Sequence, residues 1–163
     1  MSNVNIEITA YKTLMPYLIH ATTRMWYTSF LPPLVAPALF IFIFGAIVGA
    51  RIAPVEGLNY MQYIAPGLAI MVIMNVAYAD SSGFFYHAKS ARFIEQALVS
   101  PTSIYVVLGC YISIGMLNSL FLGLIMMLFL SFYASISIAS ITITLSTAVL
   151  ASLIFSMAGI ISA

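Results

Sequence analysis

Long apolar stretches, separated from one another by charged residues, dominate the chain. A transmembrane helix needs about 20 mainly apolar residues, because each residue adds about 1.5 Å and the hydrocarbon core of a bilayer is about 30 Å thick. Residues 31–50 and 60–78 form two such stretches, the first followed by Arg51 and the second by Asp80. The pattern therefore predicts two transmembrane helices in the first half of the chain.

The second half contains no charged residue after Glu95. Its apolar length is too great for one transmembrane helix and fits two. The polar stretch 131–137 is the best place for the turn between them, with a single re-entrant segment as the alternative. We expect spans at about 104–130 and 138–161. The fold class that follows is all-α: a polytopic membrane helix bundle with about four transmembrane helices.

An amphipathic segment precedes the first span. Within residues 8–25, one helical face would carry four residues that recur every four positions: Lys12, Pro16, His20 and Arg24. The opposite face is apolar at helical spacing, with Tyr11, Leu14, Met15, Leu18 and Met25. This pattern predicts a helix in the membrane interface, with its apolar face in lipid. Pro16 is expected to kink or divide that helix. The alternative is a helix packed on its own protein.

A second amphipathic segment, residues 84–100, lies between the second and third spans. Lys89, Arg92 and Glu95 are three residues apart, so they would share one helical face. The other face would be apolar, formed by Phe93, Ile94, Ala97 and Leu98. We expect a short helix that docks on another protein, and the alternative is a solvated helix without a partner.

Basic residues predict the orientation of the chain. Lys12 and Arg24 precede the first span, Lys89 and Arg92 follow the second, and Arg51 alone lies between the two. Because positive residues concentrate in cytoplasmic loops, we expect the N-terminus and residues 84–100 to lie in the cytoplasm.

Composition agrees with a membrane protein and excludes several other functions. The chain is 63% hydrophobic and 6% charged, against roughly 25% charged in an average soluble domain, and its mean hydropathy is +1.12. A net charge of +1 without a basic run predicts no nucleic-acid partner. No phosphate-binding loop, metal motif or nucleophile motif is present, so we expect no catalytic residue, no cofactor and no metal.

An ionisable residue near the centre of a span is the usual mark of an ion-coupled carrier. The centres of the expected spans carry none. Asp80 is the nearest case, at one end of the second span, and we expect it to cap a helix or to pair with Lys89 or Arg92. Energy for any transport would then have to come from a partner.

Several motifs resemble the permease subunits of type-2 ABC exporters. The resemblance is strong over residues 24–101. It rests on Gly57-Leu-Asn-Tyr-Met-Gln-Tyr-Ile-Ala-Pro-Gly67, Arg92-x-Ile-Glu95 and Leu98-Val-x-Pro101. The resemblance implies a bacterial inner membrane protein that pairs with a second permease subunit, as a homo- or heterodimer, and with a separate cytoplasmic ATPase.

In that family the loop after the second span is the coupling helix, which sits in a groove of the ATPase. Carried onto this chain, the ATPase-coupling role falls to Phe85, Lys89, Arg92, Ile94 and Glu95. The resemblance does not fix the substrate, which in the family ranges over polysaccharides, lipid-linked glycans, drugs and other hydrophobic compounds.

Length is where the chain departs from the family pattern, which has about six spans. We expect an N-terminal fragment or a truncated reading frame, because the sequence stops after the fourth expected span. A small four-helix membrane scaffold or assembly protein without transport activity is the alternative function. A membrane-embedded enzyme ranks third, because the expected spans contain no polar cluster.

Overall fold

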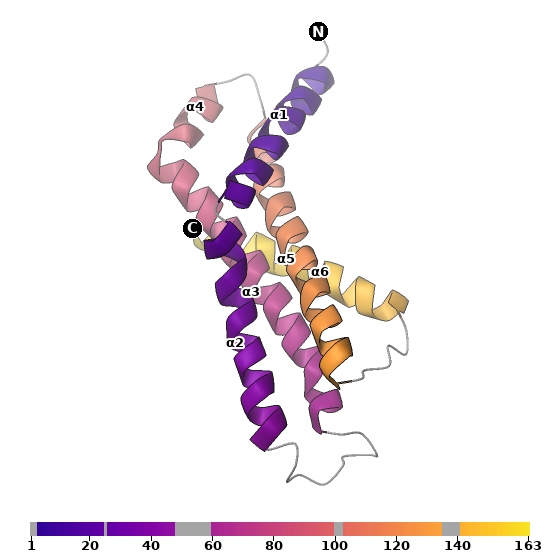
Figure 1. Cartoon of the computed structure of the whole chain (residues 1–163). Coiled ribbons are helices and arrows are strands. Elements are labelled where there is room, and N and C mark those ends of the chain that lie inside the picture. Colours follow the sequence, from indigo (N-terminus) through magenta and orange to yellow (C-terminus); the bar gives the residue numbers. More distant parts are fainter. Residues whose placement is uncertain (1–2, 25, 48–59, 100–102, 135–140) are drawn as a thin grey trace.

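The computed structural model describes residues 3–24, 26–47, 60–99, 103–134 and 141–163, which form helices and no strand (Figure 1). This confirms the all-α fold class. The helices are α1 (Asn3–Arg24), α2 (Trp26–Ile47), α3 (Tyr60–Ser90), α4 (Phe93–Val99), α5 (Ile104–Ala134) and α6 (Ile141–Ser162).

The centre of the bundle is α3, which packs against α2, α5 and α6. Helices α3 and α5 are antiparallel, because Phe85 contacts Tyr111 near one end and Asp80 bonds to Asn118 farther along. One buried apolar cluster joins α2, α3 and α5: Ile41, Ala65, Leu68, Ala69, Val72, Val76, Leu122, Met126 and Leu130. A second joins α1, α3 and α5: Leu18, Ala88, Val107, Cys110, Tyr111 and Ile114.

Three helices of the described part, α3, α5 and α6, are long and apolar enough to cross a membrane. A fourth span results if α1 and α2, whose axes differ by 56°, are counted together as one bent span. The expected first span at 31–50 corresponds to α2, although residues 48–50 lie outside the described residues. Helices α5 and α6 correspond to the expected spans at 104–130 and 138–161, although residues 138–140, and residues 135–137 of the expected turn, lie outside the described residues.

Helix α3 is longer than the second span predicted at 60–78, since it continues to Ser90. The apolar stretch ends near Asp80, but no proline interrupts the helix there, so the backbone hydrogen bonds continue past the apolar boundary. The helix expected at 84–100 is therefore divided. Its first part is the end of α3, and its second part is α4.

Arg92 forms the turn between α3 and α4, with a φ of 55°. The backbone N–H of Ala91 donates to the His87 carbonyl (2.9 Å), and that of Arg92 donates to the Lys89 carbonyl (3.1 Å). A left-handed residue immediately after a helix is a common way of ending it. The turn puts Lys89 and Glu95 on different helices, so the expected single charged face does not form.

Helix α1 packs on α5 through the face that was expected to lie in lipid. Leu18 is buried in the second cluster, with Leu14 and Met15 packed beside it. The predicted polar face is exposed: Lys12, Pro16, His20 and Arg24. Helix α1 also continues through Pro16 and is not divided there. Protein thus covers part of the predicted apolar face, and the position of α1 in the membrane interface stays a prediction.

Candidate functional site

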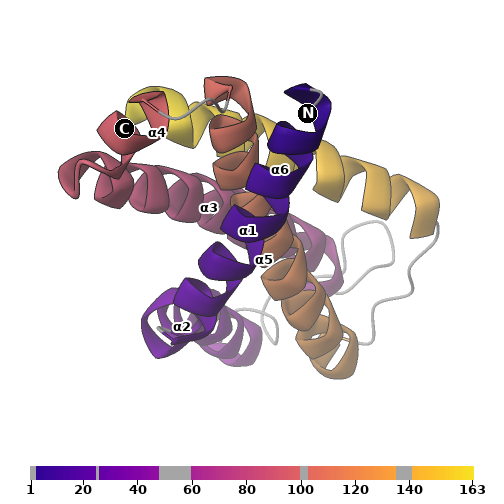
Figure 2. The same ribbon diagram turned by 90° about the horizontal axis from the view of Figure 1, so that it is seen from above.

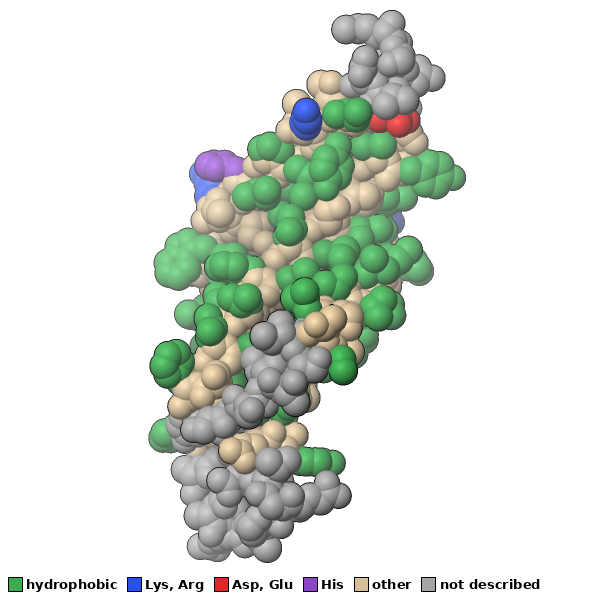
Figure 3. Space-filling model, turned by 90° about the vertical axis from the view of Figure 1, so that its right-hand side faces the viewer, with side chains coloured by type: hydrophobic (Ala, Val, Ile, Leu, Met, Phe, Trp, Pro, Cys, Tyr) green, Lys and Arg blue, Asp and Glu red, His purple; other side chains and the backbone are tan. Residues whose placement is uncertain are grey.

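Charged side chains gather toward one end of the described structure. Helix α1 carries Glu7, Lys12 and Arg24, and the last third of α3 carries Asp80 and Lys89. Arg92 lies in the turn after α3, and Glu95 lies on α4. Figure 3 shows basic, acidic and histidine side chains near the upper part of one face, with apolar side chains over the middle. Seen from above, α4 and the ends of α3 and α6 lie on the same side of the molecule (Figure 2).

Three of the five residues predicted to couple to an ATPase are exposed there. Lys89 lies in the last turn of α3, and its Nζ donates a hydrogen bond of 3.2 Å to the Ala163 carbonyl oxygen. Arg92 forms the turn, and Glu95 lies in the first turn of α4. We call these three exposed side chains at the turn between α3 and α4 the charged corner.

The other two predicted residues, Phe85 and Ile94, point inward. The Phe85 ring meets the Tyr111 ring edge to face, with centroids 5.8 Å apart and an interplanar angle of 81°. Ile94 packs on the same buried cluster from α4. The five residues therefore divide into a charged corner of three and two apolar side chains that hold the corner on the bundle.

The sequence led us to expect that Asp80 caps a helix or pairs with Lys89 or Arg92. In the structure Asp80 instead bonds to a neutral residue. Asn118 of α5 donates from Nδ2 to Asp80 Oδ2 over 2.8 Å. The same nitrogen lies 3.4 Å from Thr22 Oγ1, and the Thr22 hydroxyl donates to the Leu18 carbonyl over 3.0 Å. This polar network joins α1, α3 and α5, which explains why a carboxyl group is tolerated between them.

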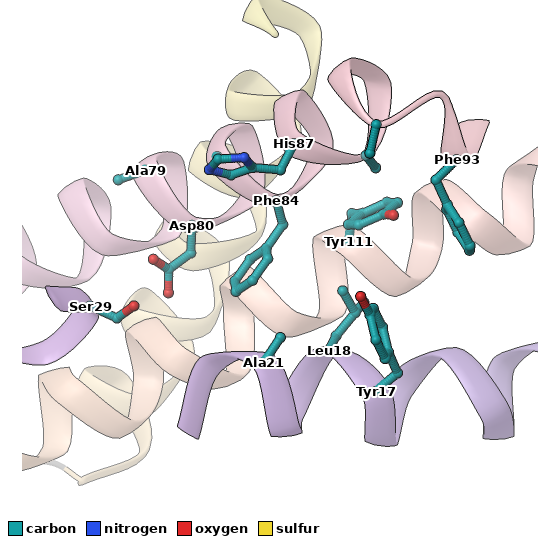
Figure 4. A pocket seen from close by; sticks show the side chains of 13 residues that line it. Tyr17, Leu18, Ala21, Ser29, Ala79, Asp80, Phe84, His87, Phe93 and Tyr111 are labelled. Carbon is teal, nitrogen blue, oxygen red and sulfur yellow. The ribbon is translucent and has the colours of Figure 1, made fainter. Parts of the chain in front are cut away.

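A cleft of about 590 Å³ adjoins the network between α1, α2, α3, α4 and α5. Figure 4 shows the Asp80 carboxylate directed from α3 into the space between Ser29 and Phe84. The wall combines Asp80 and His87 with four aromatic side chains, Tyr17, Phe84, Phe93 and Tyr111. Sequence reasoning missed this cleft, because residues from separate helices form it. The isolated Asn118 in an otherwise apolar stretch was the signal available.

Groups suited to a metal ion are not assembled in the described part of the chain, where no three His, Cys, Asp or Glu side chains lie together. Cys110 is a free thiol within the second buried cluster. The chemical features of this end are therefore a charged corner, a polar network and a cleft with aromatic walls.

These features define the class: a multi-pass α-helical membrane protein whose charged residues, within the described ranges, lie toward one end. The chain is similar to the inner membrane transport permease YadH of Escherichia coli K12, with 33% identity over 153 residues and 94% of this chain. YadH of Escherichia coli O157:H7 and of Shigella flexneri give the same values. This homology confirms the resemblance to transport permeases and the assignment to the inner membrane.

The alignment covers 60% of the length of each of these relatives. No family model matches the chain. No solved structure matches it either.

Proposed function

We propose that this chain is a membrane subunit of an ATP-binding-cassette exporter, coupled to a separate cytoplasmic ATPase and paired with a second permease subunit. The observation that carries the proposal is the homology to transport permeases over 94% of the chain. The motif resemblance to type-2 ABC exporters supports ATP hydrolysis as the energy source. The chain itself has no phosphate-binding loop, so the proposal assigns nucleotide hydrolysis to the partner.

The charged corner is the surface we assign to the ATPase. Lys89, Arg92 and Glu95 are exposed and present both signs of charge on a short segment. Phe85 and Ile94 are assigned a different role from surface contact, because both pack against the cluster that contains Tyr111. They would hold the corner rigidly on α3 and α5, so that movement of the corner moves both helices.

The continuity of α3 supports mechanical coupling. Its 31 residues correspond to about 46 Å at 1.5 Å per residue, more than the hydrocarbon core of about 30 Å. One helix thus runs from the charged corner to the first buried cluster, which contains Ala65 and Leu68. A displacement applied near Lys89 would reach that cluster without crossing a flexible joint.

Hydrolysis of ATP by the intact complex tests this proposal. The tagged chain would be purified from native membranes with its bound partners and reconstituted into liposomes. Arg92→Asn combined with Glu95→Gln should lower vanadate-sensitive ATP hydrolysis by about tenfold, because loss of charge pairs at an interface typically costs at least that much. Asparagine is chosen because it tolerates a positive φ.

The matched control is Lys12→Gln, which removes an exposed charge from α1 at the same end of the molecule. Hydrolysis should stay within about twofold of the unmodified complex, as expected for an isolated surface charge. Purification without any ATPase, or equal hydrolysis in all three proteins, would contradict the proposal. The scaffold function would then account better for the chain.

A further inference from the structure

The cleft beside the polar network combines negative charge with aromatic walls. Asp80 is the acidic residue in its wall, and His87 is the one basic residue among the described wall residues, which include no Lys or Arg. Tyr17, Phe84, Phe93 and Tyr111 supply rings from α1, α3, α4 and α5. The volume of about 590 Å³ lies within the range of small-molecule sites, about 300–1,000 Å³.

Asp80 is held in place by a neutral partner. Its Oδ2 accepts the hydrogen bond from Asn118, which is neutral, and no cationic side chain bonds to it among the described residues. Asn118 is itself fixed by its contact with Thr22, and both residues are buried. A carboxylate in a partly apolar site is stabilised by a cation that is brought to it.

We propose that this cleft binds an organic cation with an apolar body. Asp80 supplies the counter-charge, and the aromatic side chains enclose the apolar body and favour the positive charge through their ring faces. The network of Asn118 and Thr22 positions the carboxylate before the ligand arrives. Binding at this site does not depend on the proposed ATPase, so either proposal can fail without the other.

Two sources share this ligand chemistry: a soluble lipophilic cation and a lipid with an ammonium headgroup. The probe is tritiated tetraphenylphosphonium, a permanent cation with an aromatic body. Tetraphenylborate has nearly the same shape with the opposite charge. Binding to the full chain would be measured in dodecyl maltoside micelles, whose headgroups carry no charge, by equilibrium dialysis.

We expect saturable binding of tetraphenylphosphonium that Asp80→Asn weakens by about tenfold, a factor typical for loss of one close charge pair. The asparagine side chain can still accept the hydrogen bond from Asn118, and an unchanged unfolding temperature would show that the fold is retained. Glu7→Gln is the matched control, because it removes a carboxylate of α1 outside the cleft wall, and binding should not change.

A second variant tests the cleft independently of its charge. A Cβ at Gly83 meets no atom within 4 Å, and Gly83 lines the cleft. Gly83→Phe should therefore fold, fill part of the cleft and weaken tetraphenylphosphonium binding. The proposal would be overturned if the unmodified chain bound tetraphenylborate as tightly as tetraphenylphosphonium. It would also be overturned if Asp80→Asn and Gly83→Phe both bound tetraphenylphosphonium as tightly as the unmodified chain.

Addition of phosphatidylethanolamine to the micelles distinguishes the two sources. Competition with tetraphenylphosphonium that disappears in Asp80→Asn would support a lipid ammonium headgroup as the natural occupant. Unchanged tetraphenylphosphonium binding would support a soluble lipophilic cation. Both results keep the cation site in place, and the Asp80→Asn and Gly83→Phe variants decide whether the site exists.

Discussion

Small residues allow α3 and α6 to approach each other closely in the described structure. A Cβ at Gly159 would lie 2.6 Å from the Tyr78 carbonyl oxygen and 3.3 Å from the Ser82 backbone nitrogen. Ser156 and Ser152 of α6 are fully buried nearby along the same helix. Membrane helices associate through such small side chains, which let backbones approach and maximise van der Waals contact.

Gly159→Ala should therefore lower the free energy of unfolding by about 1–3 kcal/mol, because the added methyl group forces two backbones apart. Gly109→Ala is the matched control, since a Cβ at Gly109 meets no atom within 4 Å. The control should be neutral or slightly stabilising, because alanine favours helices over glycine. Unfolding in sodium dodecyl sulfate mixed micelles, followed by circular dichroism, measures both. Equal effects would contradict the close approach.

Arg92 is the other residue whose backbone sets local structure, with its φ of 55°. Arg92→Gly should raise the free energy of unfolding by up to about 1 kcal/mol, because the left-handed conformation costs residues with a Cβ roughly that much. Arg92→Val should lower it, because β-branched residues fit this region poorly. Thermal unfolding in detergent would check that stability decreases from Arg92→Gly through the unmodified chain to Arg92→Val. The reverse order of stability would show that the turn does not have this φ.

At the scale of elements, hydrophobic periodicity predicted which segments are helical but not where each ends. Asp80 closes the apolar stretch, yet α3 continues to Ser90, since helix hydrogen bonding does not require an apolar side chain. The break came instead at Arg92, which carries no sequence signal for a left-handed turn. A glycine or asparagine there would have made the turn predictable.

The amphipathic pattern of α1 predicted that its apolar face is covered. The pattern left open whether lipid or protein covers that face. The structure places Leu18 against α5, because residues far apart in the sequence, such as Tyr111 and Ile114, supply the matching surface. The cleft was hidden for the same reason. Charge spacing predicted one shared face for Lys89, Arg92 and Glu95, which the turn at Arg92 prevents, and it could not show that Phe85 and Ile94 pack inward.

Two adjacent positions on α1 test its packing. Leu18 is 3% exposed and Ile19 is 44% exposed. Leu18→Ala should lower the free energy of unfolding by about 2–3 kcal/mol, as is usual for a buried leucine, whereas Ile19→Ala should change it by less than about 0.5 kcal/mol. The mixed-micelle unfolding assay applies here too. Similar small effects at both positions would favour a helix whose apolar face lies in lipid.

At the scale of the whole molecule, the end that carries α1, α4 and the charged corner defines the orientation that we predict. Cysteines would replace Glu95 and Ser131, both exposed, in a Cys110→Ser background. A membrane-impermeant maleimide should label Ser131→Cys in intact cells and Glu95→Cys only after permeabilisation, because basic residues favour the cytoplasmic side. Labelling of Glu95→Cys in intact cells would reverse the orientation.

The measurement that tests the central claim most directly is site-specific photocross-linking in native membranes. A photoreactive amino acid would replace Arg92 in the charged corner, and Phe132, which is 89% exposed near the far end of α5, in the control. We predict an adduct at position 92 with a protein that carries a phosphate-binding loop, and no such adduct at 132. No ATPase adduct at position 92, or the same adducts at both positions, would contradict ATPase coupling through this corner.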